Sequence, residues 1–284
     1  MVSAAKWPVG VFVSLDAGLG VKWEVVKELG IRSIQMHTPH ASSRTPEKAA
    51  AFRKQLADAG VALSVVFCGY DGESYADIPT VAKTIGLVPP ETRAIRVQET
   101  KEIADFAALV GSPAIGLHIG FVPHDRSDPM YTDVLAVARE ICDYCAVKGL
   151  RVHLETGQEP ADVLLGFLED VNRDNLFINF DPANMILYGC GEPLPALRKL
   201  AKYIRSIHCK DAEWSDRPGE TWGREVPFGT GQVDAKAFLR TLYEIGYEGP
   251  LTIEREIPQE PERQKAEIGQ ALDLINGIEA EIFG

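Results

Sequence analysis

Four side chains that could share a metal ion follow apolar, β-rich segments in the second half of the chain: Glu155, Asp181, His208 and Glu254. Each would be costly to bury alone among apolar residues. Together, three carboxylates and one imidazole suit a divalent cation, and oxygen-rich ligation favours Mn²⁺, Mg²⁺ or Co²⁺ over a structural zinc. The alternative is that each is a surface residue or belongs to a separate ion pair. We expect a shared site that holds Mn²⁺, with Mg²⁺, Co²⁺ or Zn²⁺ as alternatives.

Further polar residues occupy equivalent places at strand ends and could contact a substrate. His118 ends the fourth β-rich segment, and Lys210 follows His208 by two residues, so that it faces the same way. Both are candidates for contacts with substrate oxygens. The alternative for Lys210 is a salt bridge to a barrel carboxylate.

Two other histidines have less definite roles. His37 ends the second segment, with Gln35 two residues earlier on the same face, and it is expected either to line a pocket or to serve the structure. His153 alternates with Glu155 and is expected behind the ligands, facing the interior. Trp214 and Trp222 lie after the seventh segment, where they could stack on a substrate ring or pack the loop down.

Eight β-rich segments, each followed by a segment of helical period, must position these residues. Most are nearly continuous apolar runs, which is typical of a parallel sheet buried on both faces. The predicted strands are Val9–Leu15, Ser33–Thr38, Ala62–Gly69, Ala114–Gly120, Arg151–Thr156, Leu176–Asp181, Ile204–Lys210 and Leu251–Glu254.

Predicted helices between these strands end at glycines, which supply the left-handed conformation that turns the chain into the next strand. They cover Val21–Leu29, Pro46–Ala59, Thr92–Val110, Tyr131–Lys148 and Ala235–Ile245, and a long irregular stretch runs from Tyr70 to Glu91. The repeat predicts an α/β fold with a single (β/α)8 TIM barrel as one domain over residues 1–284. A doubly wound sheet is the competitor, but the turn after the first strand lacks the third glycine of a dinucleotide fingerprint.

The charge composition argues against two classes of binding partner. The 284 residues include 29 basic and 41 acidic side chains, a net charge of −12, which argues against nucleic acid and anionic membranes. Five cysteines and no signal-peptide core at the start predict a reducing, cytoplasmic location. Cys142 and Cys145 form a C-x-x-C pair, but helical spacing and the lack of a second pair favour two buried thiols over a metal site.

These motifs taken together resemble the xylose isomerase-like TIM-barrel superfamily, the sugar phosphate isomerase/epimerase group. That group includes ketose 3-epimerases, inosose dehydratases, hydroxypyruvate isomerases and endonuclease IV. The resembling motifs occur in family order: His153-Leu-Glu155-Thr-Gly, Asn179-Phe-Asp181-Pro-Ala-Asn184, Ile207-His208-Cys-Lys210-Asp211, Pro227-Phe-Gly-Thr-Gly231-Gln-Val-Asp234 and Thr252-Ile-Glu254.

The resemblance implies one divalent ion held by Glu155, Asp181, His208 and Glu254. It also implies that the two glutamates form the acid/base pair of an isomerase or epimerase. One would remove the proton beside the ketone of a small polyhydroxy sugar, and the other would return it on the opposite face, through a metal-stabilised cis-enediolate. Family members occur as dimers and tetramers, so a homo-oligomer of either kind is possible, and the sequence leaves the oligomeric state open.

Two positions bear on the substrate. Ketose 3-epimerases usually have a histidine where this chain has Asn184, and asparagine can hydrogen-bond a sugar hydroxyl but cannot shuttle a proton. Arg224 precedes Gly229-Thr-Gly231 much as an arginine in the epimerases precedes their Gly-x-Gly, which implies a contact with the far end of a sugar.

Three rivals stay open beside the isomerase. A lyase of the inosose-dehydratase type, or another enolate-forming enzyme on a keto-sugar or keto-glycoside, would use the same metal and base. A binding barrel would keep the site without turnover. A phosphodiesterase acting on nucleic acid is disfavoured by the acidic surface and by Asn184.

Overall fold

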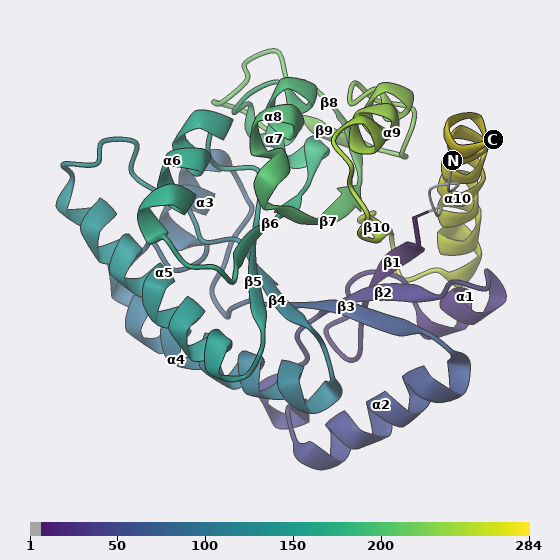
Figure 1. Cartoon of the computed structure of the whole chain (residues 1–284), viewed down its shortest axis with the longest axis horizontal. Coiled ribbons are helices and arrows are strands. Elements are labelled where there is room, and N and C mark those ends of the chain that lie inside the picture. The colour runs from purple at the N-terminus through teal and green to yellow at the C-terminus, as the bar shows by residue number, and fades with distance from the viewer. Residues whose placement is uncertain (1–6) are drawn as a thin grey trace.

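The computed structural model describes residues 7–284 and shows a closed barrel of eight parallel strands (Figure 1). Around the barrel the strands follow the order β1, β2, β3, β4, β5, β6, β7 and β10, and β10 pairs with β1 to close it. Their bounds are β1 Val9–Ser14, β2 Ser33–His37, β3 Ala62–Phe67, β4 Ala114–Leu117, β5 Arg151–Glu155, β6 Leu176–Phe180, β7 Ile204–Cys209 and β10 Leu251–Ile253.

Helices surround the barrel and cover its outer face (Figure 1). They are α1 Trp23–Glu28, α2 Pro46–Ala59, α3 Ile78–Thr84, α4 Pro90–Val110, α5 Pro129–Val147, α6 Ala161–Val171, α7 Pro182–Tyr188, α8 Pro193–Leu200, α9 Ala235–Glu244 and α10 Pro261–Phe283, with 3-10 turns at Ala41–Ser43 and Ala201–Tyr203. The fold is the predicted (β/α)8 TIM barrel, and the continuous apolar runs are its doubly buried strands.

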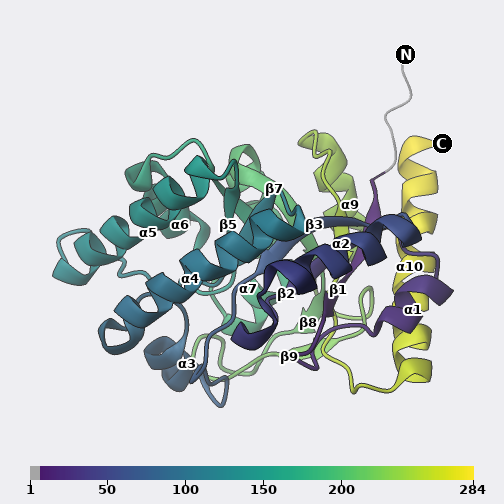
Figure 2. The same ribbon diagram turned by 90° about the horizontal axis from the view of Figure 1, so that it is seen from below.

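A two-stranded antiparallel sheet, β8 Asp211–Glu213 with β9 Arg224–Val226, interrupts the segment between β7 and α9. Figure 2 shows this hairpin and α3 on the same side of the barrel, opposite the chain termini. Both follow carboxyl ends of strands, so this side is the mouth of the barrel, where the βα loops of the fold build their sites.

The strand boundaries predicted from the sequence are nearly correct, and the errors lie at the carboxyl ends of the strands, at the mouth of the barrel. Predicted strands run one to three residues too far at their carboxyl ends, because the polar residues there turn out of the sheet into loops. The stretch from Tyr70 to Glu91, predicted to be irregular, contains α3. The Asp77 side chain accepts a hydrogen bond from the Thr80 N–H and caps that helix.

The thiols of Cys142 and Cys145 are free and buried in the core on α5, as the helical spacing indicates. Burial raises the pKa of both thiols to about 12.

In residues 7–284, none of the helices has the length and apolar character needed to cross a membrane.

Candidate metal centre and active site

The mouth of the barrel brings together the four side chains that the sequence singled out. One potential ligand atom from each of Glu155, Asp181, His208 and Glu254 lies within 4.8 Å of the others. His208 Nδ1 is 2.6 Å from Glu155 Oε1, 3.0 Å from Glu254 Oε2 and 3.4 Å from Asp181 Oδ2. The imidazole nitrogen therefore faces all three carboxylates. We call these four residues the carboxylate–imidazole cluster.

A hydrogen bond from behind sets the orientation of His208. Its Nε2 lies 2.6 Å from Gln35 Oε1, and the Gln35 amide in turn donates to Asn179 Oδ1 at 3.1 Å. Because an amide oxygen can only accept, Nε2 carries the proton and donates it to Gln35. With Nε2 bonded to Gln35, Nδ1 is the nitrogen that faces the carboxylates, and on loss of its own proton it offers the lone pair that a metal ligand needs.

The two carboxylate oxygens of Asp181 have different roles, because this residue caps a helix as well as facing the cluster. Asp181 follows β6 directly and is the N-cap of α7, so Oδ1 accepts the Asn184 N–H at 2.9 Å. Its other oxygen, Oδ2, points to the cluster and has no hydrogen-bond partner among residues 7–284. One carboxylate thus ends the turn into α7 and offers a free oxygen to the site.

The donor set fits a divalent cation. Like Asp181 Oδ2, His208 Nδ1 is buried without a hydrogen-bond partner in the part of the chain that the structure describes. Buried polar atoms are normally satisfied, so two such atoms facing each other call for a further group. Burial would lower the pKa of His208, yet the charges of Glu254 and Glu155 hold it well above its usual value. The cluster therefore attracts positive charge at the point that Nδ1 faces.

His118 holds Glu155 from the other side of the cluster. Its Nε2 lies 2.9 Å from Glu155 Oε2, and Gln158 Nε2 lies 3.0 Å from His118 Nδ1. An amide that donates to Nδ1 leaves the proton on Nε2, where it is directed at the carboxylate. Burial would raise the pKa of Glu155, but the adjacent His118 and His208 lower it to about 2. Burial raises the pKa of Asp181 to about 6.

Lys210 supports Glu254 in a similar way. The Lys210 ammonium is buried and lies 3.3 Å from Glu254 Oε2, 3.5 Å from Glu225 Oε2 and 3.7 Å from Glu256 Oε1. Burial would raise the pKa of Glu254, but Lys210 and the cluster imidazole hold it well below its usual value. Lys210 therefore makes the salt bridge that was its alternative role, and it also lines the cavity at the mouth of the barrel.

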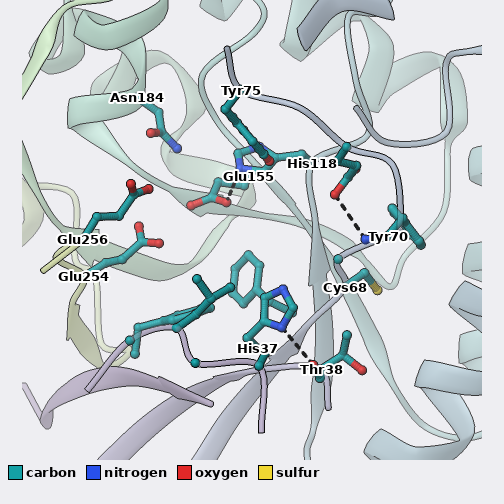
Figure 3. Close-up of a pocket in the computed structure, with 18 of the residues that line it drawn as sticks. His37, Thr38, Cys68, Tyr70, Tyr75, His118, Glu155, Asn184, Glu254 and Glu256 are labelled. Carbon is teal, nitrogen blue, oxygen red and sulfur yellow. Dashed lines mark hydrogen bonds and ion pairs between the residues drawn. The ribbon is translucent and has the colours of Figure 1, made fainter. Parts of the chain in front are cut away.

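A cavity of about 770 Å³ opens above the cluster. Glu155, Glu254, His118, Asn184 and His37 all line it, and Figure 3 shows Asn184 on one side and His37 on the opposite side. The His37 Nδ1 lies 2.8 Å from the Thr38 carbonyl, to which it donates, and Nε2 is then an acceptor. A side chain on Gly69 would place its Cβ 2.3 Å from that Nε2, so glycine is required beside it.

Some residues considered from the sequence lie elsewhere. Arg224 is on β9, its side chain is 70% exposed and pairs with Glu213, and it is outside the cavity lining in the part of the chain that is described. Trp222 lines the cavity, whereas Trp214 packs against the core. His153 faces the barrel interior but contacts Ser206, with Nδ1 2.8 Å from Oγ, and not the cluster.

Sequence reasoning missed the residues that hold the ligands in place: Gln35, Asn179, Gln158 and Glu225. Gln35 offered a signal, since it shares a face with His37 in a strand of mostly apolar residues.

Asp211, the last residue of the motif at the end of β7, has a structural role. The Asp211 carboxylate accepts backbone N–H groups of Ala212, Gly229, Gly231 and Val233, and a Cβ on Gly231 would lie 2.3 Å from its Oδ1.

Comparisons with known proteins identify the family of this chain. Residues 23–276 match the family model described as xylose isomerase-like TIM barrel. The chain is 30% identical over 164 residues to L-ribulose 3-epimerase of Methylomonas sp. (strain DH-1), a match covering 52% of this chain and 51% of that protein. The chain thus spans about half the length of this curated relative.

Two solved structures share the architecture. A xylose isomerase domain protein from Planctomyces limnophilus is 58% identical, with a TM-score of 0.95 and coverage of 98% of this chain and 99% of that one. A D-tagatose 3-epimerase-like protein is 17% identical, with a TM-score of 0.72 and coverage of 96% and 99%, and shows the fold alone. The chain therefore belongs to the xylose isomerase-like TIM barrel family.

Proposed function

We propose that this protein is a divalent-metal-dependent sugar isomerase or epimerase that acts on a small polyhydroxy ketone through a cis-enediolate. The carboxylate–imidazole cluster is the observation that carries the proposal. It combines three carboxylates with an oriented imidazole nitrogen at the floor of a cavity. The partial match to L-ribulose 3-epimerase supports the same reaction class.

Glu155, Asp181, His208 and Glu254 would hold the ion, with Mn²⁺ the first choice and Mg²⁺, Co²⁺ or Zn²⁺ as alternatives. When bound, such an ion acts as a Lewis acid that stabilises negative charge developing on a ketone oxygen. Asp181 and His208 are fully buried and serve as ligands only. Glu155 and Glu254 line the cavity and are therefore available to a substrate as well.

Glu155 and Glu254 would form the acid/base pair. One carboxylate removes the proton from the carbon beside the carbonyl, which gives the enediolate and leaves that carboxyl protonated. The other glutamate takes up a proton from solvent and gives it to the carbon on the opposite face, and the first then releases its proton to solvent. His118 and Lys210 hold the two carboxylates by hydrogen bonds of 2.9 and 3.3 Å. Both glutamates are ionised at neutral pH, because these cations lower the pKa of each.

Asn184 and His37 would bind sugar hydroxyls from opposite sides of the cavity (Figure 3). The Asn184 amide can donate and accept, and His37 Nε2 accepts. Arg224 has no part in this proposal because it lies outside the cavity lining among the described residues.

Exchange of carbon-bound hydrogen tests the proposal. Metal-depleted protein is incubated in D₂O with a panel of ketoses and inososes, with and without Mn²⁺, and deuterium at carbon is followed by NMR. We expect incorporation only with metal, at the position beside the carbonyl. Failure of the Mn²⁺-loaded protein to exchange any compound of the panel would contradict the proposal and favour a binding barrel.

Dehydration is a second candidate, and Lys210 favours it. A buried ammonium 3.3 Å from Glu254 could protonate a hydroxyl that leaves after enolate formation. Mass spectrometry separates the two reactions, since dehydration removes one water from the product and isomerisation does not.

A further inference from the structure

The cavity is larger than the reacting part of a single sugar requires. At about 770 Å³ it lies in the upper part of the range of roughly 300–1,000 Å³ for sites that enclose drug-sized ligands. A hexose is smaller than such ligands. The lining continues from the glutamates at the floor to Tyr75 and Trp222 on one wall and to Leu19 and Gln259 on another. Space is therefore available beyond the ring that contacts the cluster.

The lining is acidic, and each of its lysine and arginine side chains has a carboxylate partner, although Nη1 of Arg44 is buried without a hydrogen-bond partner among residues 7–284. Arg44 bonds to Glu99 at 2.7 Å, Lys210 contacts three carboxylates, and Arg255 bonds to Glu225 at 2.7 Å. These are the arginine and lysine residues of the cavity lining within residues 7–284. A phosphate needs unpaired cations or converging backbone amides, and surplus carboxylates repel it. The charge balance therefore favours an uncharged ligand.

Aromatic rings form the wall beside the cluster. Tyr188 and Trp222 are in edge contact with ring centroids 4.6 Å apart, and the Trp222 indole N–H donates to the Tyr75 carbonyl at 3.2 Å. Tyr75 is nevertheless 50% exposed, and Figure 3 shows its side chain directed toward Glu155 and His118. An exposed aromatic ring at a cavity wall, here Tyr75 beside the half-buried Trp222, suits the apolar face of a sugar ring.

The wall is built on a fixed loop. Glu73 accepts the N–H groups of Tyr70 and Gly86 at 3.1 and 2.7 Å, and so ties the two ends of the loop that carries Tyr75. The buried Arg96 donates to the carbonyls of Thr84, Gly86 and Asp71 from below. A surface held in this way is organised before a ligand arrives, which reduces the entropic cost of binding.

We propose that the natural substrate is a neutral sugar of two rings. The keto-bearing ring would lie at Glu155 and Glu254, and a second ring, joined by a glycosidic bond, would stack on Tyr75 and Trp222. This inference rests on the proposed function, because it places the reacting carbon at the cluster. It assigns Tyr75 and Trp222 the role of selecting the substrate and no role in the chemistry.

Binding and turnover test the inference separately. Titration calorimetry on Mn²⁺-loaded protein compares D-fructose, D-fructose 6-phosphate and maltulose, an uncharged two-ring ketose. We expect maltulose to bind at least about tenfold more tightly than D-fructose. D-fructose 6-phosphate is expected to bind more weakly than either of these sugars. Equal affinity for one and two rings, or tighter binding of the phosphate, would overturn the inference even if deuterium exchange supports the proposed function.

Variants locate the second ring. Tyr75→Ala is expected to lower the ratio of kcat/KM for maltulose over D-fructose by about tenfold, and Tyr75→Phe to retain it, because the ring and not the hydroxyl makes the contact. Tyr243→Ala is the matched control, since Tyr243 is 47% exposed on α9, outside the cavity lining among the described residues. An unchanged ratio in Tyr75→Ala would overturn the assignment. Absence of exchange with every compound would instead point to failure of the proposed function.

Discussion

Two buried histidines inside the barrel have opposite environments. His208 faces three carboxylates near the mouth, and they raise its pKa well above the usual value although burial opposes them. His153 faces Ser206 on the same barrel interior, and burial together with Arg151 and Arg205 lowers its pKa to about 3. Both side chains are almost fully buried.

The difference shows that a buried histidine alone does not identify a site. His153 is neutral, with Nδ1 bonded to Ser206 and with Nε2 buried without a hydrogen-bond partner among residues 7–284, and no carboxylate faces it. His208 is placed where its free nitrogen and surrounding negative charge call for a cation. Substitutions at Glu155, Glu254, His208, Gln35 and His153 test this contrast.

The largest effect is expected from removing the acid/base carboxylates that surround His208. Glu155→Gln and Glu254→Gln should each lower deuterium exchange by about 10²–10⁴-fold, the contribution of a positioned general acid or base. Initial rates in D₂O under saturating Mn²⁺ measure it. Glu213→Gln, in the hairpin and paired with Arg224, is the control and should exchange as wild type does. A rate near wild type in either cavity variant would remove the acid/base assignment.

Loss of the His208 imidazole should mainly weaken the binding of the metal ion. His208→Ala removes the nitrogen that faces all three carboxylates, and we expect the Kd for Mn²⁺ to rise by more than about 100-fold. Metal content after dialysis and calorimetry measure this effect. Because a bound ligand stabilises the fold, added Mn²⁺ should raise Tm in wild type and not in this variant. Equal metal content in both proteins would contradict a ligand role for His208.

A smaller loss of metal affinity should follow when His208 is kept but loses the hydrogen bond that orients it. Gln35→Ala deletes the acceptor that holds the proton on Nε2, and loss of such an outer contact typically weakens metal binding by about 10–100-fold. Calorimetry with Mn²⁺ gives the Kd. Gln98→Ala, on the exposed surface of α4, serves as the control. If Gln35→Ala binds Mn²⁺ as tightly as wild type, the tautomer of His208 is set in another way.

His153→Leu should change the pH dependence of stability and little else. The pKa of His153 is about 3 in the fold, below the usual 6.5 that it has when unfolded. The unfolded chain therefore binds the extra proton between these values, and wild type loses stability as pH falls from about 6.5 toward 3. Urea midpoints at several pH values should show a shallower loss in His153→Leu, with Mn²⁺ content retained. Parallel pH profiles would show that His153 is not buried in its neutral form.

Sequence periodicity predicted the barrel because parallel strands and their covering helices leave a strong local pattern. The carboxylate–imidazole cluster was predictable for a related reason: a charged residue at the end of an apolar run, as at Asp181 or Glu254, is costly to bury unless a counter-charge meets it there. Boundaries failed where polar residues leave the sheet. The capped helix at Asp77 was missed because glycine and proline around it indicate loops.

Contacts made across the barrel were beyond sequence reasoning. Gln35 and His208 lie 173 residues apart, and Gln158 reaches His118 from a neighbouring loop. Nothing in their local spacing indicates these pairs. For Arg224 the motif position implied a sugar contact, which stays a prediction, and the hairpin turns its side chain to solvent and to Glu213. Pairing across a closed barrel requires the fold itself.

The most direct test of the metal centre is anomalous diffraction from crystals soaked in Mn²⁺. We predict one strong anomalous peak within coordination distance of His208 Nδ1 and of the carboxylates of Glu155, Asp181 and Glu254. A peak elsewhere in the molecule, or none at this position under saturating Mn²⁺, would contradict the central claim.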